Sequence, residues 1–202
     1  MAMPAFNALF TKERLRNLDE SRQLLFGALC CERLLPNYIA FQKDTGWGDF
    51  SVVRNALDNV WKFLGAEVMT AQEIAAEILK CEAVTPSSDE FSSLYVTSAQ
   101  DACFSVCCLL DCLVQADVEK IVQVAMYATD SVDLYVQEID EMKPGDPSLE
   151  EKILTHRLMQ RELTQQEHDL KAIELAPSLD EDFLIRCKSS WGNNGKSNLD
   201  IP

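Results

Sequence analysis

Apolar residues recur at helical spacing over most of this 202-residue chain. One such stripe runs through residues 52–64, with polar residues on the opposite face, and a longer one runs from Val118 to Ile139. A stripe of this period buries one side of a helix and leaves the other side in water. No segment has the sustained alternation that a half-buried strand needs. The chain is therefore predicted to be all-α.

Polar residues that start helices, and glycine or proline residues that stop them, predict the helix boundaries. Five Ser or Thr residues stand three positions before Glu or Gln, the spacing of a capping box, in which each side chain accepts a hydrogen bond from the other residue's backbone N–H. These pairs are Thr70–Glu73, Ser87–Glu90, Thr97–Gln100, Ser148–Glu151 and Ser178–Glu181. With the periodicity they predict helices near residues 5–17, 19–43, 50–64, 71–83, 98–115, 118–142, 149–175 and 179–190.

The segment 98–115 differs from the others because apolar residues occur on all its sides. A helix of this kind is buried by its neighbours, so we expect it to be the central helix, surrounded by the rest, in a compact bundle of about seven to nine helices. A chain of this length forms one hydrophobic core. Residues 1–202 are therefore predicted to be a single domain, in which 192–202 form an irregular C-terminal tail.

The stretch Cys31–Asp49 is predicted to be a helix with a proline in its middle and a corner at its end. Pro36 lacks an N–H, and its ring presses on the carbonyl four residues earlier, so the helix is expected to kink or restart there. Two glycines flank Trp47. Because glycine adopts the left-handed backbone conformation without a steric penalty, the helix is expected to end there. Asp49 is placed to cap the next helix, and Trp47 is expected to fold back onto the core.

Acidic residues outnumber basic residues by 33 to 18, which gives a net charge of −15. This charge repels a phosphate backbone and an anionic membrane, so nucleic-acid and membrane partners are not expected. The N-terminus has no signal-peptide pattern, and no apolar stretch reaches the roughly 20 residues of a membrane span. The expected location is the cytoplasm, where the eight cysteines stay reduced.

Three groups of residues resemble ligand-binding or catalytic motifs but lack the required spacing. The cysteines at 103, 107, 108 and 112 spread over half of a helix circumference, which is the pattern of small core residues rather than of paired zinc ligands. The glycine-rich stretch 192–197 lacks the strand and the following helix of a phosphate-binding loop. His156 and His168 lie on different sides of their helix. No cofactor and no metal is therefore predicted.

Glu32 and Asp101 are the best candidates for a functional carboxylate, because each lies in an apolar helix. A buried charge needs a partner, and Arg33 or Arg54 could supply it. The two carboxylates are either members of structural ion pairs or part of a functional site. The structural role is favoured here.

Several motifs resemble those of the YjaG-like family of bacterial proteins, a family annotated only as a domain of unknown function. They are CERLLPNYIAF followed by TGWGD, then PSSDEF at 86–91, DAC at 101–103 and GKSNLDI at 195–201. The resemblance runs in the same order over nearly the whole chain. It implies a compact all-helical fold in a bacterial cytoplasm, and it implies no reaction, cofactor or catalytic residue.

Two classes of function remain. The first is a non-catalytic interaction or regulatory protein, in which the acidic surface or the aromatic corner contacts a protein partner or a second copy of the chain. The second is a small-molecule-binding protein or an enzyme with a carboxylate-lined pocket between helices. The first is favoured because no nucleophile, metal shell or phosphate cradle has the required spacing. The candidate site residues of the two hypotheses are Glu32, Asn37, Tyr38, Phe41, Trp47, Asp49 and Asp101.

Overall fold

The structure, a computed structural model, describes residues 6–189, 193 and 195–202. These residues form nine helices and no strand, which confirms the predicted all-α class. The helices are α1 (Ala8–Arg16), α2 (Glu20–Thr45), α3 (Phe50–Leu64), α4 (Ala71–Ala83), α5 (Val96–Val114), α6 (Val118–Ile139), α7 (Leu149–Thr155), α8 (Arg157–Leu175) and α9 (Glu181–Ser189).

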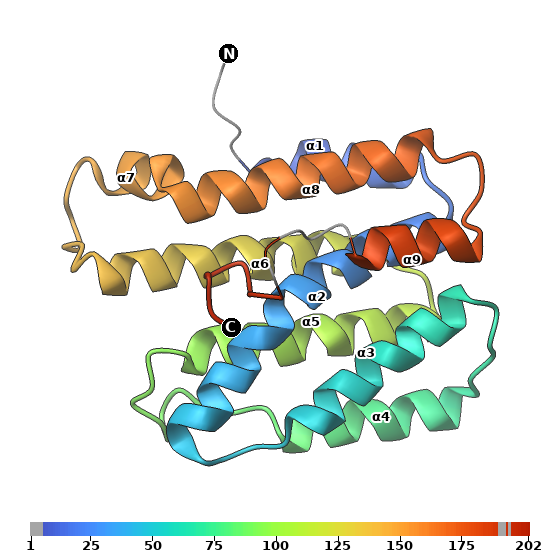
Figure 1. Ribbon diagram of the computed structural model, residues 1–202, viewed down its shortest axis with the longest axis horizontal. Coiled ribbons are helices and arrows are strands. Elements are labelled where there is room, and N and C mark those ends of the chain that lie inside the picture. Colours follow the sequence, from blue (N-terminus) through green and yellow to red (C-terminus); the bar gives the residue numbers. More distant parts are fainter. Residues whose placement is uncertain (1–5, 190–192, 194) are drawn as a thin grey trace.

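Figure 1 shows the main helices in two layers. α8, α6, α5 and α4 lie beside one another in a row, and α2 crosses in front of this row with α3 beside it. α2 contacts α3, α5, α6, α8 and α9, so it holds the layers together. Every residue from Leu24 to Cys31 is buried. At Gly27 the layers approach so closely that a Cβ would lie 2.5 Å from the Leu109 side chain.

α5 is the central helix that the sequence predicts near residues 98–115. It contacts α2, α3, α4 and α6, and Cys103, Val106 and Leu110 on its inner side are fully buried. Its outer side is open, since Phe104 is 41% exposed and Cys108 is half-buried. The expectation that the other helices surround α5 is therefore wrong on one side, because its four neighbours cover only part of its circumference.

Pro36 lies inside α2, which continues across it as one helix. The proline removes one backbone hydrogen bond, and Figure 1 shows that α2 changes direction near its middle. α2 ends at Gly46, which has a left-handed backbone with φ 70°. Asp49 then caps α3 by accepting a 2.9 Å hydrogen bond from the Ser51 N–H. The predicted kink, stop and cap agree with the structure.

Among the described residues, one of the five predicted capping boxes forms. Thr70 accepts a hydrogen bond from the Glu73 N–H, and the Glu73 carboxylate accepts one of 2.8 Å from the Thr70 N–H. The predictions for the pairs that begin at Ser87, Thr97, Ser148 and Ser178 are wrong. At the Ser178 site a nearby aspartate takes the role of the cap, because Asp180 accepts a 2.8 Å hydrogen bond from the N–H of Phe183 in α9. Ser148 is the N-cap residue of α7, but its side chain makes no capping hydrogen bond.

The helix predicted over residues 149–175 is in fact two helices. His156 separates α7 from α8 with φ −63° and ψ 138°, an extended conformation. Its Nδ1 accepts a 3.3 Å hydrogen bond from the Leu158 N–H, so His156 is the N-cap of α8. Apolar periodicity continues through the break, and for this reason the pattern alone predicted one helix.

The described residues 195–202 contain no helix, and they are anchored to the bundle. Leu199 and Ile201 are buried in a hydrophobic cluster with residues of α6 and α8. The Asp200 carboxylate forms ion pairs with Arg157 and Arg161. Residues 190, 192 and 194, which belong to the predicted last helix and tail, lie outside the described residues.

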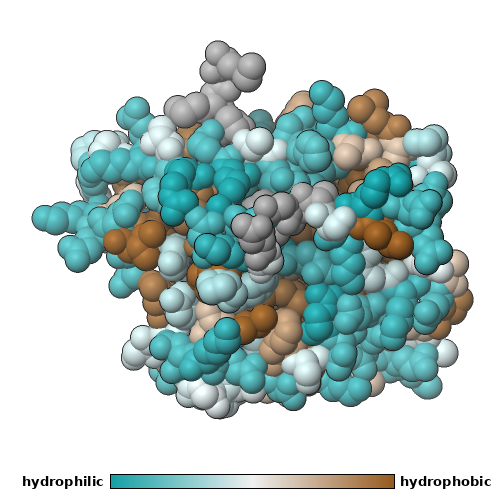
Figure 2. Space-filling model, viewed as in Figure 1, coloured by the Kyte–Doolittle hydropathy of each residue, from teal (hydrophilic) through white to brown (hydrophobic). Residues whose placement is uncertain are grey.

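α2 and α5 are long and apolar enough to cross a membrane when only length and composition are considered. This corrects the prediction that no stretch reaches that length. Within the fold, 83% of the apolar window of α2 and 50% of that of α5 are buried. Core helices pass the same test, so the two helices are weak evidence for a membrane span. In Figure 2 the visible face is mostly hydrophilic, with hydrophobic residues in small separate groups.

Candidate functional site

Glu32 of α2 connects this helix to α3 and α9. Its carboxylate accepts hydrogen bonds of 2.7 and 3.0 Å from the two terminal nitrogens of Arg54 and one of 2.7 Å from Trp61 Nε1. Lys188 of α9 is a further ion-pair partner at 3.8 Å. Arg54 is one of the two partners expected from the sequence. Because every one of these groups stabilises the charged carboxylate, the geometry supports a structural role for Glu32.

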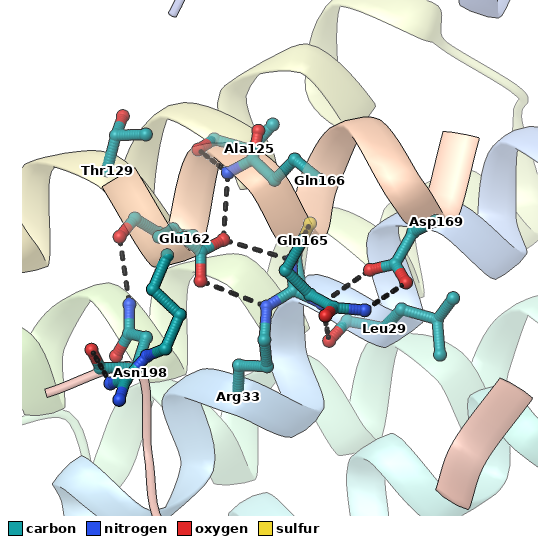
Figure 3. A network of polar contacts seen from close by, with 12 residues as sticks. Leu29, Arg33, Ala125, Thr129, Glu162, Gln165, Gln166, Asp169 and Asn198 are labelled. Atoms are coloured by element: carbon teal, nitrogen blue, oxygen red, sulfur yellow. Dashed lines mark hydrogen bonds and ion pairs between the residues drawn. The ribbon is translucent and has the colours of Figure 1, made fainter. Parts of the chain in front are cut away.

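Arg33 belongs to a buried network between α2 and α8 (Figure 3). Its Nε and one terminal nitrogen donate to the Glu162 carboxylate at 3.0 and 2.9 Å, and the other terminal nitrogen donates to Asp169 at 2.7 Å. Gln166 donates to Glu162 at 2.9 Å and to the Ala125 carbonyl of α6 at 3.1 Å. Burial raises the pKa of Asp169 although Arg33 lies beside it. One guanidinium therefore holds two buried carboxylates.

Glu162, Gln166 and Asp169 are not among the site residues predicted from the sequence. A signal was present, because the three residues occupy the same side of the helix as the buried Leu158 and Ile173. A polar residue at such a position enters the core and needs a partner there. The partner of Glu162 is Arg33, 129 positions away, and the sequence gives no means of pairing residues so far apart.

Asn37 contacts the C-terminal segment. Its Nδ2 donates a 3.1 Å hydrogen bond to Asn198 Oδ1, and Asn198 Nδ2 donates one of 2.9 Å to the Ala128 carbonyl of α6. The Asn198 N–H donates to the Arg33 carbonyl at 3.0 Å. Both asparagines are fully buried. Asn37 therefore helps to fix the C-terminal segment between α2 and α6.

Tyr38, Phe41 and Trp47 form the predicted corner together with Phe91. The centroids of neighbouring rings lie 5.2–6.1 Å apart. The Tyr38 hydroxyl donates to a backbone carbonyl at 2.7 Å and accepts a 3.1 Å hydrogen bond from the Asp49 N–H. Trp47 folds back onto the core as expected. Since Tyr38 and Phe41 are fully buried, they stabilise the corner and are closed to a partner.

Asp101 differs from the other candidate carboxylates because its partner is uncharged. It accepts a 2.7 Å hydrogen bond from the Ser131 hydroxyl of α6. Burial raises its pKa to about 7, and the neighbouring Asp130 adds to this rise. Burial also raises the pKa of Asp130. Within the described part of the chain, neither carboxylate forms an ion pair with Lys, Arg or His. Asp101 is half-buried and Asp130 is exposed.

Asp101 lies on the outer sides of α5 and α6, which we call the α5–α6 face. The face consists of Asp101, Phe104 and Cys108 of α5 and Gln123, Tyr127, Asp130 and Leu134 of α6. The ring centroids of Phe104 and Tyr127 are 5.9 Å apart, so the aromatic side chains link the two helices. Phe104 is 41% and Leu134 is 48% exposed. The face combines exposed apolar side chains with carboxylates that have no cationic partner.

The structure distributes the predicted site residues over several environments. Tyr38 and Asp49 are in contact, and Tyr38 shares the aromatic corner with Phe41 and Trp47. Glu32, Asn37 and Asp101 bond to Arg54, Asn198 and Ser131 respectively. The structure therefore does not bring the seven candidate side chains together in one place.

The structure also describes most of the residues that resemble metal-binding or phosphate-binding motifs in the sequence. In the described ranges, no group of three or more His, Cys, Asp and Glu side chains is arranged to hold a metal ion. Burial raises the pKa of the thiols of Cys103, Cys108 and Cys112. Their placement agrees with small, weakly reactive residues that pack in or beside the core. The glycine-rich stretch 192–197 lies partly outside the described residues.

A groove of about 560 Å³ lies between α3 and α9. Trp61 and Leu64 line it from α3, and Leu184, Ile185 and Lys188 line it from α9. The Lys188 ammonium lies 5.1 Å from the centroid of the Trp61 ring. Trp61 and Lys188 also contact Glu32. The groove therefore adjoins the ion pairs of Glu32, although Glu32 is not part of its lining.

The fold and these sites define a helical-bundle protein whose two layers are joined by buried polar contacts. The family model described as "Protein of unknown function (DUF416)" matches residues 10–202, and the chain belongs to this family. A crystal structure of a DUF416 family protein from Shewanella baltica OS155 superimposes with a TM-score of 0.85 at 26% identity, over 94% of this chain and 97% of that one.

Two bacterial relatives are named as uncharacterized proteins. The protein YjaG of Escherichia coli strain K12 is 34% identical over 93 residues, which are 46% of this chain and 47% of that protein. A protein of Haemophilus influenzae is 24% identical over 191 residues, which are 94% of this chain and 95% of the relative. The expected resemblance to the YjaG-like family and its helical fold is therefore confirmed.

Proposed function

We propose that this protein is a non-catalytic interaction protein of the cytoplasm and that it binds a protein partner through the α5–α6 face. The observation that carries this proposal is the open outer side of an apolar helix. α5 is apolar enough to pass for a membrane span by length and composition, yet half of its apolar window is not buried in the fold. Exposed apolar and aromatic side chains that adjoin polar ones are typical of protein interfaces.

The other candidate residues support this choice because their polar groups already bind within the molecule. Glu32, Arg33 and Asn37 join α2 to other parts of the fold, and Asp49 caps α3. Asp101 lies half-buried at the α5–α6 face, where its hydrogen-bond donor among the described residues is the uncharged Ser131. An interaction there adds contacts without breaking those that hold the bundle together.

Affinity purification from the native host tests the proposal with a matched pair of variants. Phe104→Ala/Leu134→Ala removes the apolar side chains of the α5–α6 face. Leu79→Ala removes an equally apolar side chain of α4 that is 65% exposed. A stoichiometric, salt-sensitive partner is expected with the wild type and with Leu79→Ala, and it is expected to be lost with the double variant. Equal recovery with the double variant contradicts the proposal, provided that all three proteins have similar melting temperatures.

A small-molecule-binding function is the second candidate, and the groove between α3 and α9 supports it. Its volume of about 560 Å³ is within the range of known ligand sites, and Glu67 and Glu181 contribute carboxylates to its lining. A thermal-shift screen of metabolites tests this function. A compound that raises the melting temperature of the wild type but not of Ile185→Trp would support it, and a shift that persists in the variant would place the compound elsewhere.

A further inference from the structure

We infer that the partner segment bound by the α5–α6 face is a basic amphipathic helix, which lies along both helices and brings Lys or Arg to Asp101 and Asp130. This inference rests on the proposed function, because it names the chemistry of the partner for the same face. It also goes further, since the face alone could accept an uncharged apolar segment.

The shape of the face favours a helical occupant. α5 and α6 are neighbours joined by a short connection, and on their inner sides they already pack against one helix, α2. The outer side of two adjacent helices, like the inner side, presents ridges and grooves of side chains into which a third helix can pack. On the outer side, Tyr127 and Leu134 of α6 are seven residues apart, so they lie about 10 Å apart along one face. A partner helix matches this distance with apolar residues two turns apart.

The apolar part of the contact comes from both helices. Phe104 of α5 and Leu134 of α6 are 41% and 48% exposed, and the centroid of the Tyr127 ring lies 5.9 Å from that of Phe104. Aromatic side chains of this kind contribute strongly to interfaces when a partner covers them. These residues therefore provide the apolar surface that the apolar side of a partner helix would cover.

The charge of the partner follows from the two carboxylates. Asp101 comes from α5 and Asp130 from α6, and the charge of Asp130 adds to the rise in the pKa of Asp101. At the far end of the same helix pair, Lys120 pairs with Asp111 at 2.7 Å, so the carboxylate there is already matched. A cation from a partner would supply the missing charge at Asp101 and Asp130. The net charge of −15 would also attract a basic segment over longer distances.

A second copy of the chain is a poorer occupant of this face. In a symmetric dimer the same surface meets itself. The seven residues of the face include Asp101 and Asp130 but no Lys or Arg, so a second copy would leave both carboxylates without a counter-charge. A partner of opposite charge avoids this cost.

Three synthetic peptides of about 18 residues, long enough to span the face, test the inference with the full-length protein. The first has Leu and Lys arranged on opposite sides of a helix. The second has the same composition in scrambled order, and the third has Glu in place of each Lys. Fluorescence anisotropy measures the affinity of each peptide, and salt at about 150 mM weakens nonspecific charge attraction. The amphipathic Lys peptide is expected to bind at least about tenfold more tightly than either of the others.

A matched pair of protein variants locates the binding. Asp101→Asn/Asp130→Asn removes two charges from the face, and Asp44→Asn/Asp89→Asn removes two charges from exposed positions elsewhere. Affinity for the amphipathic Lys peptide is expected to fall at least about fivefold in the first variant and less than about twofold in the second. Equal losses in both variants, or equal binding of the ordered and scrambled peptides, would overturn the inference.

The failure of this inference can be distinguished from the failure of the proposed function. If the purified partner depends on Phe104 and Leu134 but binds through an acidic or uncharged segment, the interaction function stands and the basic helix is wrong. If light scattering shows a dimer that Phe104→Ala dissociates, the face binds a second copy, and the inference is likewise overturned.

Discussion

Two carboxylates that the sequence ranks together have different surroundings. Glu32 and Asp101 both lie in apolar helices, and this is all that their local sequence shows. Glu32 accepts hydrogen bonds from Arg54 and Trp61 of α3, whereas the hydrogen bond that Asp101 accepts in the described part of the chain comes from the Ser131 hydroxyl of α6. The difference comes from residues that are remote in the sequence, so it could not be predicted. It assigns a structural role to Glu32 and leaves Asp101 available for function.

Asp101→Asn is expected to stabilise the protein at neutral and higher pH. The native pKa of Asp101, about 7, is above the ordinary value of 3.8, so the native state holds the proton more tightly than the unfolded chain. Ionisation therefore costs stability as the pH rises from about 4 to 7. Ser131 and Asp130 of α6 face this carboxyl. We expect Asp101→Asn to flatten this part of the pH profile and to raise the free energy of unfolding at about pH 8 by about 1 kcal/mol.

Urea denaturation between about pH 4 and 8 measures this effect. Glu32→Gln is the matched control, because it also replaces a carboxylate by an amide, but the carboxylate it removes is hydrogen-bonded to Arg54. We expect this control to lose stability at about pH 8. A loss of stability in Asp101→Asn at the same pH would show that Asp101 is structural after all.

At the scale of the elements, the corner between α2 and α3 depends on Gly48. Its φ is 93°, and a Cβ at this position would lie 2.4 Å from the Tyr38 hydroxyl oxygen. That hydroxyl is itself bonded to the Asp49 N–H and to a backbone carbonyl. Gly48 is therefore fixed both by its backbone conformation and by the buried ring beside it.

Gly48→Ala is expected to lower the free energy of unfolding by about 2–4 kcal/mol, because left-handed strain and the clash with Tyr38 add together. Gly46→Ala separates these two causes, since Gly46 has φ 70° but no atom within 4 Å of an added Cβ. Its expected cost is about 1 kcal/mol. Thermal denaturation measures the loss of stability in both variants. An equal loss in the two would mean that the Tyr38 side chain moves away from the added methyl group without an energetic penalty.

The sequence predicted most elements because helix formation depends on local pattern and local stop signals. The ranges 50–64 and 71–83 coincide with α3 and α4. The errors have physical causes. His156 interrupts a continuous apolar stripe through its backbone conformation, and aspartates such as Asp180 displaced the Ser or Thr expected at a cap. Several polar side chains can compete for one helix start, and the sequence does not show which one succeeds.

At the scale of the whole molecule, Arg33 connects the first half of the chain to the second. Its guanidinium is the cation between Glu162 and Asp169, and all three side chains are at most 2% exposed. No charge pattern near Arg33 predicts these partners. The sequence therefore predicts the helices well but says little about the polar contacts that determine how they pack.

Arg33→Met is expected to lower the free energy of unfolding by about 3–5 kcal/mol, because it leaves two buried carboxylates without their cation. Lys80→Met is the matched control: Lys80 is paired with Glu77, but its side chain is 60% exposed. This control is expected to leave the free energy of unfolding nearly unchanged, because water screens an exposed ion pair. Chemical denaturation at neutral pH compares them, and a cost below about 1 kcal/mol for Arg33→Met would mean that the carboxylates become neutral or reach water.

The distance in sequence between Arg33 and its partners has a consequence for fragments of the chain. A piece cut between α5 and α6 retains Arg33 but loses Glu162, Asp169 and Asn198, which contact that residue. Neither piece can satisfy its interior polar groups without the other. Cleavage by a protease in this loop would therefore leave two pieces that remain associated or are degraded together, rather than one stable half.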